Sequence, residues 1–241
     1  MEMSPYLELL KSVLIGSLLA KDGEDRRRAE DAEVVLSKCA WTMIGRRRLE
    51  SLEEQIRQIV HDGIDGDLIE AGVWRGGACI FMRAVLLALG DEKRHVVLAD
   101  SFQGLPRPDP ASYPEDRGDR HHEESLLRVG LERVRDSVQR FGFLDSRSEF
   151  VPGWFRDTLP TLTGRRWSLV RLDADMYEGT ILGLRHLYPG LSVGGYLVVD
   201  DYGDRGKEGQ AKKAAEDYRI EHGITDPIEW IDRCAVAWRK S

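Results

Sequence analysis

The sequence predicts an α/β fold in which helices cover both faces of a mostly parallel central sheet. From residue 66 onward, short apolar stretches alternate with segments that carry apolar residues at helical spacing. This alternation is typical of parallel, doubly wound sheets. Four of the apolar stretches also end in acidic residues, and in such sheets ligands bind beyond the carboxyl ends of the strands. The sequence therefore predicts the fold class and the edge of the sheet that carries a site.

Length and composition restrict the class of protein. The 241 residues suffice for one sizeable α/β domain with additional helices. The net charge of −7, without an acidic or basic tail, argues against nucleic acid and anionic membranes as general partners. No apolar run approaches the roughly 18 residues that a membrane span needs, and the first residues lack the basic region of a signal peptide. We therefore expect a cytoplasmic protein.

We expect the cysteines and the two arginine runs to have structural roles and no role in a functional site. Cys39, Cys79 and Cys234 are odd in number, far apart and set in apolar contexts. This pattern favours buried free thiols in a reducing compartment over a disulfide or a zinc site. The arginine runs at 26–28 and 46–48 lie among acids and are expected on solvated helix faces.

Residues 1–65 are expected to form an N-terminal helical region. Apolar residues at helical spacing predict helices over 5–20 and 49–61, with a charged segment that includes a loop between them. The apolar and aromatic run 39–45 has two interpretations, which are core packing between the N-terminal helices and a lid over the site. The sequence favours neither.

Residues 66–241 form the second predicted unit, which holds the alternating strands and helices. A loop rich in proline, glycine and aspartate at 104–123 is long for a compact domain, and such loops are usually functional or mobile. The apolar pattern predicts strands at 68–70, 95–100, 149–153, 167–173 and 196–201, helices at 77–89, 124–141, 178–188 and 207–222, and short β segments near 229–231 and 235–238.

The first of these strands leads into a glycine-rich turn with the spacing Glu70-x-Gly72-x-x-x-Gly76-Gly77. This spacing matches neither the dinucleotide fingerprint nor the phosphate-binding loop. An acid directly before a glycine turn suits a ligand with an amino group and a positive centre, and S-adenosylmethionine (SAM) is such a ligand. The alternative is a purely structural turn.

Asp100 ends the next strand, where a carboxylate can accept hydrogen bonds from both hydroxyls of a ribose. The alternative is an acid that only terminates the strand. Trp74, Trp154 and Phe155 follow strand ends and either line a nucleoside pocket or serve ordinary packing.

Three further acids, Asp173, Asp200 and Asp201, follow the fourth and fifth strands without a cluster of cysteine or histidine nearby. Carboxylate sets of this kind suit Mg²⁺ better than zinc. Without a cation the three charges would repel one another and raise their pKa values, although lysine or arginine partners are another way to neutralise them. His121 and His122 in the long loop are alternative candidates for a base, but adjacent loop histidines are more often exposed.

Taken together, these residues resemble the macrocin O-methyltransferase family, which methylates sugar hydroxyls on antibiotics. The family is similar in fold and metal arrangement to catechol O-methyltransferases. The resemblance implies a Rossmann-like SAM-dependent methyltransferase fold, an N-terminal helical lid region, and dependence on SAM and Mg²⁺. It spans nearly the whole chain, and its matching runs are residues 42–45, 70–82, 99–106, 152–160, 171–178 and 199–203.

The resemblance also implies roles for individual residues. Asp173 is the expected general base, a metal ligand and a neighbour of the cofactor, with Asp200 and Asp201 completing the metal site. The implied cofactor contacts are Glu70, Gly72 and Trp74 at the methionine part, Asp100 and Ser101 at the ribose, Phe155 and Arg156 at the adenine, and Thr42 and Met43 closing over the cofactor. Gly76 of the glycine turn is a further expected cofactor-binding residue.

The acceptor remains open, because residues 108–122 match the family only loosely. The family expectation is a small-molecule glycosylated acceptor, and we also expect a homo-oligomer. One departure is Gly179, where the family often has serine.

Two other functions would explain parts of this sequence. A metal-dependent nucleotide-sugar glycosyltransferase would use Asp173-x-Asp175 but leaves the glycine turn and Asp100 without roles. A noncatalytic SAM-binding protein would not require three metal-binding acids.

Overall fold

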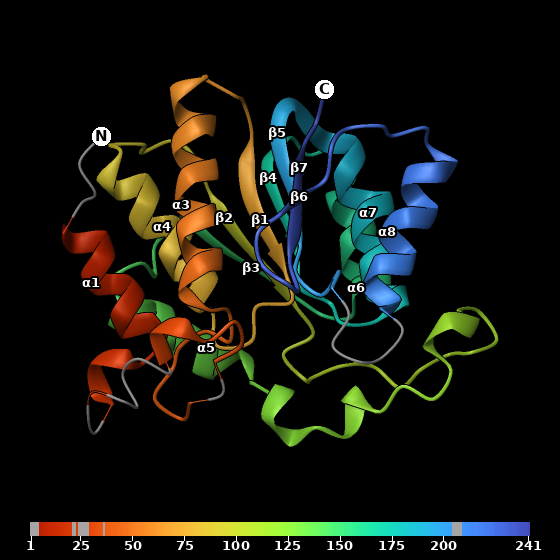
Figure 1. Ribbon diagram of the computed structural model, residues 1–241, viewed down its shortest axis with the longest axis horizontal. Helices are drawn as coiled ribbons and strands as arrows, with labels where there is room; N and C mark the ends of the chain where they lie inside the picture. Colours follow the sequence, from red (N-terminus) through yellow and green to blue (C-terminus); the bar gives the residue numbers. More distant parts are fainter. Residues whose placement is uncertain (1–4, 21–22, 24–28, 36, 204–208) are drawn as a thin grey trace.

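The protein is described by a computed structural model that covers residues 5–20, 23, 29–35, 37–203 and 209–241. Within these residues, seven strands form one sheet in the order β3-β2-β1-β4-β5-β7-β6 (Figure 1). The first five strands along the chain pair in parallel, and β6 and β7 add an antiparallel edge. The predicted mostly parallel sheet is therefore confirmed. The strands are β1 Asp67–Ala71, β2 Val96–Asp100, β3 Ser148–Pro152, β4 Trp167–Leu172, β5 Leu191–Val199, β6 Glu229–Trp230 and β7 Val236–Arg239.

Helices cover both faces of this sheet, as predicted. In Figure 1, α1, α3, α4 and α5 lie on one side, and α6, α7 and α8 lie on the other. Their bounds are α1 Pro5–Leu14, α3 Arg46–His61, α4 Gly77–Ala88, α5 Leu131–Arg140, α6 Phe155–Thr158, α7 Tyr177–Leu187 and α8 Gln210–Glu221.

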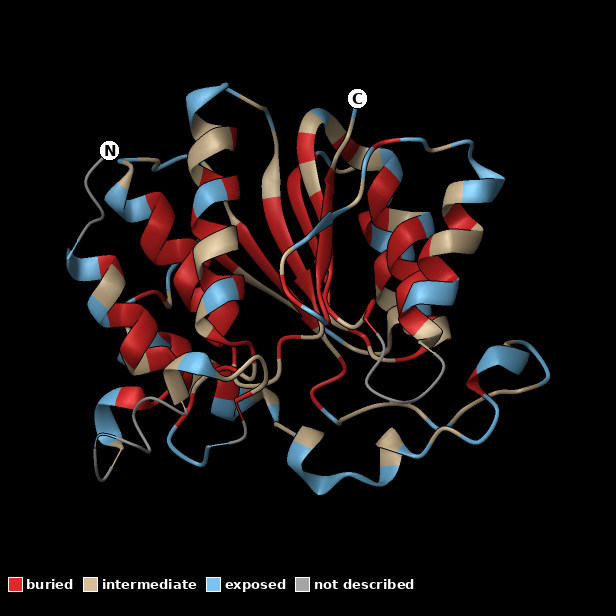
Figure 2. Ribbon diagram, viewed as in Figure 1, coloured by how far each residue is buried: buried red, intermediate tan, exposed pale blue. Residues whose placement is uncertain are grey.

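Consecutive side chains of the central strands pack on opposite faces of the sheet. Leu68 of β1 belongs to the apolar cluster formed with α1, α3, α4 and α5, whereas the next residue, Ile69, belongs to the cluster formed with α7 and α8. Side chains of a strand point to opposite faces in turn, so a strand that is covered on both faces is apolar at most positions. Its buried charged residues, such as Glu70 of β1 and Arg171 of β4, pair with each other inside the protein. Figure 2 shows the central strands buried between the two helical layers.

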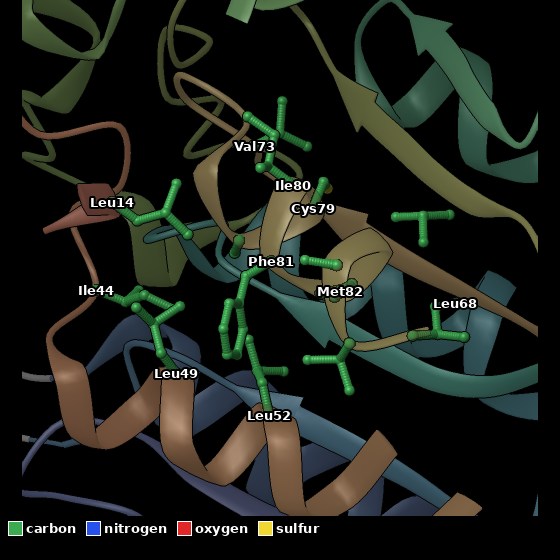
Figure 3. Close-up of a cluster of buried hydrophobic side chains, with 14 of the residues drawn as sticks. Leu14, Ile44, Leu49, Leu52, Leu68, Val73, Cys79, Ile80, Phe81 and Met82 are labelled. Carbon is green, nitrogen blue, oxygen red and sulfur yellow. The ribbon is translucent and has the colours of Figure 1, made fainter. Parts of the chain in front are cut away.

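The N-terminal helices pack directly on α4. Leu14 of α1 and Leu49 and Leu52 of α3 lie around Phe81 of α4 (Figure 3), and all four side chains are almost completely buried. Burying one such side chain contributes roughly 1.5–3 kcal/mol. Since α4 begins at the glycine turn, this packing fixes the N-terminal helices close to the predicted site.

Several elements differ in extent from the sequence prediction. The first helix ends at Leu14, because Gly16 adopts a φ of 75° and only a short 3₁₀ turn, Ser17–Leu19, follows. The helix predicted from residue 124 starts at Leu131, where Gly130 is extended and precedes the first turn. Residues before it form two short 3₁₀ turns, His121–Glu123 and Ser125–Leu127.

Some predictions fall outside the described residues. These are the start of the chain, the arginine run at 26–28, most of the charged segment at 21–33 and the first two residues of the helix predicted over 207–222.

The cysteines are free, but only two of them match the prediction. Cys79 and Cys234 are buried, whereas Cys39 is exposed because it lies in a surface turn. Among the described residues, no helix has the length and apolar character that would let it cross a membrane.

Candidate active site

The acids at the strand ends lie at one edge of the sheet. The register aligns Ala71 of β1 with Ala99 of β2 and with Leu172 of β4, and it aligns Leu172 with Val199 of β5. The residues that follow these four positions therefore reach the same level. They are Gly72, Asp100, Asp173 and Asp200, as the sequence analysis predicts for a parallel sheet.

The turn after β1 requires glycine at two points. Gly72 has a φ of 93°, and a Cβ there would lie 1.8 Å from the carbonyl oxygen of Asp173. Gly76 is left-handed directly before α4, where a Cβ would lie 3.0 Å from Val134. Trp74, between them, has a φ of 47°, a conformation that costs energy for a residue other than glycine. Such strain is concentrated at functional sites in folded proteins.

A pocket of about 770 Å³, part of it open to solvent, lies beside this turn. Eight of the predicted site residues line it, which are Met43, Gly72, Trp74, Asp100, Ser101, Phe155, Arg156 and Asp173. Trp154 also lines the pocket.

Three predicted cofactor residues do not line the pocket. Thr42 is buried and its hydroxyl accepts a hydrogen bond from the amide of Ile44 at 3.3 Å. Glu70 is buried against the guanidinium of Arg171 and accepts a hydrogen bond from the thiol of Cys79 at 2.8 Å. Gly76 is the left-handed residue directly before the first turn of α4. Each of the three lies next in sequence to, or within two residues of, a residue that lines the pocket, namely Met43, Gly72 or Trp74.

Asp100 is placed to accept hydrogen bonds from a ligand. Its two carboxylate oxygens already accept the amides of Val73 at 2.8 Å and Phe102 at 2.7 Å, which fixes the orientation of the carboxylate. The amide of Trp74 and the hydroxyl of Ser101 also bond to this carboxylate, the hydroxyl at 3.4 Å, and Asp100 lines the pocket that a ligand would enter. Burial raises the pKa of Asp100, and these backbone hydrogen bonds act in the opposite direction.

The three acids predicted to hold a metal come together. One carboxylate oxygen from each of Asp173, Asp200 and Asp201 lies within 4.8 Å of the other two. Burial raises the pKa of Asp173 well above its usual range, and the nearby charge of Asp200 adds to the effect. The donor set consists only of oxygen, which fits a hard divalent cation.

Two buried arginines partly neutralise these acids. Arg171 of β4 bonds to Glu70, to Asp173 at 2.9 Å and to Asp200. Arg48 of α3 bonds to the other oxygen of Asp200 at 2.6 Å and to Asp232 at 2.6 Å. Burial lowers the pKa of both guanidinium groups, but the surrounding carboxylates outweigh it and hold the pKa above its usual value. Two positive charges thus face five carboxyl groups, with Asp201 included, so a divalent cation fits the charge of the site.

The position of Arg48 corrects the prediction that residues 46–48 form a solvated face. Arg47 is exposed, but Arg48 is buried because Asp200 and Asp232 provide carboxylate partners inside the protein. Arg46 is half-buried and pairs with Glu8 and Glu30. No signal in the sequence separates Arg48 from its neighbours in the arginine run.

Other pocket residues were missed or were left open by the sequence. Asp175 lines the pocket with a φ of 55°. Leu105, Pro106 and Leu127, from the two ends of the long loop, also line it. The nearby histidines do not line this pocket, and the Nδ1 atom of His121 lies 2.7 Å from Asp119.

Comparison with known proteins agrees with this geometry. The family model of macrocin-O-methyltransferase (TylF) matches residues 19–240. One relative is 8-demethyl-8-(2,3-dimethoxy-alpha-L-rhamnosyl)-tetracenomycin-C 4'-O-methyltransferase from Streptomyces olivaceus. The two sequences are 43% identical over an alignment that covers 97% of this chain and 92% of the relative. This chain is 41% identical over 90% of its length to 84% of mycinamicin III 3''-O-methyltransferase from Micromonospora griseorubida.

A solved structure shows the same fold. The structure of the O-methyltransferase NovP is 39% identical and superposes with a TM-score of 0.91 over 98% of both chains. The family match covers the strand ends, the glycine turn and the acidic cluster described above. The chain therefore belongs to the macrocin-O-methyltransferase (TylF) family and is a SAM-dependent O-methyltransferase.

Proposed function

We propose that this enzyme transfers the methyl group of SAM to a hydroxyl of a sugar on a glycosylated natural product, in a reaction that depends on Mg²⁺. The observation that carries the proposal is the adjacency of two features at one sheet edge. Asp173 both lines the pocket beside the glycine turn and belongs to the cluster of three carboxylates. The relatives named for tetracenomycin and mycinamicin support the choice of a glycosylated acceptor.

In this proposal the pocket binds SAM along the strand ends. Gly72 and Trp74 border the methionine part, Asp100 accepts the ribose hydroxyls with Ser101 beside it, and Phe155 and Arg156 flank the adenine. Met43 covers the cofactor from the N-terminal side. All of these residues line one pocket. Glu70, Thr42 and Gly76 do not line this pocket, so the proposal gives them no direct contact with SAM.

Asp173, Asp200 and Asp201 hold the cation in this proposal. A bound Mg²⁺ would acidify a coordinated hydroxyl and fix its position. Asp173 would accept the proton of that hydroxyl as general base, since it lines the pocket and belongs to the carboxylate cluster. Arg171 orients Asp173 and Asp200 by bonding to both.

The acceptor is tested with methyl-labelled SAM and a panel of desmethyl glycosides that includes mycinamicin III and demethyldecarbamoylnovobiocin. We expect label to appear on a sugar oxygen of at least one glycoside and on none of the matching aglycones. Labelling of an aglycone hydroxyl alone would contradict the sugar assignment. A thermal-shift control with S-adenosylhomocysteine and a uridine nucleotide should show stabilisation by the first only.

We also propose that the chain forms a homo-oligomer. Large apolar side chains of the N-terminal region, Tyr6 and Leu9 of α1 and Leu19 of the following 3₁₀ turn, are 46%, 56% and 68% exposed, and this exposure motivates the proposal. Light scattering coupled to size-exclusion chromatography should give a mass of at least two chains, and a single-chain mass would contradict this proposal.

A further inference from the structure

Residues 101–130 connect β2 to α5 as one long segment that crosses beneath the carboxyl edge of the sheet (Figure 1). Its two ends lie at the SAM pocket, because Leu105, Pro106 and Leu127 line it. The ends are held locally. The hydroxyl of Ser101 donates to the carbonyl of Gly104 at 2.6 Å, and the indole of Trp74 donates to the carbonyl of Leu126 at 2.8 Å.

The middle of the segment is held by a different contact. Asp116 has no exposed surface, and its two carboxylate oxygens accept the amides of Tyr177 at 2.7 Å and Glu178 at 2.9 Å. These amides belong to the first turn of α7, where backbone N–H groups have no partner within the helix. A carboxylate placed there satisfies two of them and interacts favourably with the helix dipole. The rings of Tyr113 and Tyr177 lie 6.2 Å apart beside this contact.

This contact places the middle of the segment at the starts of the helices that follow the acid-ended strands. α7 begins at Tyr177, four residues after Asp173, and α8 begins at Gln210, nine residues after Asp201. Gln210, the first residue of α8, donates to the carbonyl of Glu115 at 3.3 Å. Residues 113–116 therefore contact the first turns of the two helices that follow the acid-ended strands β4 and β5.

We propose that residues 107–122 form the acceptor-side wall of the active site and that Asp116 is the positioning residue that holds this wall in place. This inference rests on the proposed function, because an acceptor whose hydroxyl approaches Asp173 passes between the acidic cluster and this wall. The cofactor pocket has its own anchors at Ser101 and Trp74, so Asp116 serves the acceptor and not SAM.

The test compares Asp116→Ala and Asp116→Asn with Glu115→Gln. Glu115 is the exposed neighbour, and its substitution also removes one negative charge. Because asparagine retains one acceptor oxygen, Asp116→Asn should have a smaller effect than Asp116→Ala. Asp116→Asn is also the variant to measure if Asp116→Ala fails to fold. Hydrogen exchange, measured with S-adenosylhomocysteine bound, should become at least about fivefold faster in residues 107–122 and in the first turn of α7. The affinity for S-adenosylhomocysteine should stay within about twofold.

Kinetics with the glycoside that the labelled panel identifies provide the second readout. KM for the glycoside should be lowest in the control Glu115→Gln, higher in Asp116→Asn and highest in Asp116→Ala. KM for SAM should be unchanged in all three variants. Unchanged exchange in residues 107–122 of the Asp116 variants would overturn the anchoring role. An equal rise in both KM values, or an equal loss of S-adenosylhomocysteine affinity, would overturn the assignment to the acceptor side. Since the exchange and affinity measurements need no acceptor, a failure of the sugar assignment would be recognised separately.

Discussion

Arg48 donates from Nη1 to the Oδ2 atom of Asp200 at 2.6 Å, although 152 residues separate them in the chain. The same guanidinium bonds to Asp232 through Nε at 2.6 Å, and its side chain is 3% exposed. One residue of α3 thus joins the end of β5 to the turn between β6 and β7. The N-terminal helical region therefore contributes a charge to the proposed metal site.

We predict that Arg48→Met lowers the free energy of unfolding by about 3–5 kcal/mol, because it leaves two buried carboxylates without this partner. The matched control is Arg47→Met, which removes the same group from an exposed position of the same helix and should change stability by less than about 0.5 kcal/mol. Urea denaturation followed by circular dichroism measures both. Equal effects of the two substitutions would contradict the structural role of Arg48.

The ribose assignment predicts a specific loss of cofactor affinity in Asp100→Ala. A hydrogen bond to a charged group contributes roughly 1.5–3 kcal/mol, so the dissociation constant for S-adenosylhomocysteine should rise at least about tenfold. Asp91→Ala is the control, since Asp91 also accepts two backbone amides, from Lys93 at 3.0 Å and Arg94 at 3.1 Å, but does not line the pocket. Calorimetric affinity that is the same in both variants would remove Asp100 from the ribose site.

Residues 42–45, which we expect to cover the cofactor, should change their hydrogen exchange when the cofactor binds. Met43 lines the pocket, its carbonyl accepts the amide of Val35 at 2.7 Å, and Thr42 is buried beside it. Residues 42–45 should exchange more slowly when S-adenosylhomocysteine is bound, because closure over the ligand excludes water. The C-terminal half of α3 is the internal reference. Equal exchange in the free and bound states would favour the alternative of plain core packing.

The sequence predicts the sheet edge well because its signals there are local. An apolar run followed by an acid identifies the strand ends at Asp100 and Asp173, and parallel pairing then brings such ends together without further information. The glycine turn is equally local, since the left-handed conformation of Gly72 and its close approach to Asp173 require the smallest residue.

The remaining features depend on contacts between distant residues, which no local pattern shows. Arg48 resembles its neighbours in an arginine run, and only the folded protein brings Asp200 and Asp232 to it. Asp116 lies in a segment rich in turn residues, and its partners at α7 are 61 and 62 residues away. Helix ends are also poorly predicted, because Gly16 and Gly130 end or delay helices whose apolar spacing continues beyond them.

The proposed general base predicts different kinetic effects for the three acids. Asp173→Asn keeps the shape of the side chain but removes its ability to accept a proton, so kcat should fall by at least about 10² while affinity for S-adenosylhomocysteine stays near normal. Asp200→Asn and Asp201→Asn should instead raise the Mg²⁺ concentration needed for half-maximal activity. A fully active Asp173→Asn enzyme would move the role of base elsewhere, with His121 and His122 the next residues to test.

Removing the metal is the sharpest test of the proposed mechanism, because Asp173, Asp200 and Asp201 bring three carboxylate oxygens within 4.8 Å of one another. The measurement is methyl transfer from labelled SAM to the identified glycoside after exhaustive chelation with EDTA and removal of the chelator. We predict that turnover is lost and that added Mg²⁺ restores it, while binding of S-adenosylhomocysteine persists throughout. Undiminished turnover in the chelated enzyme would contradict the account.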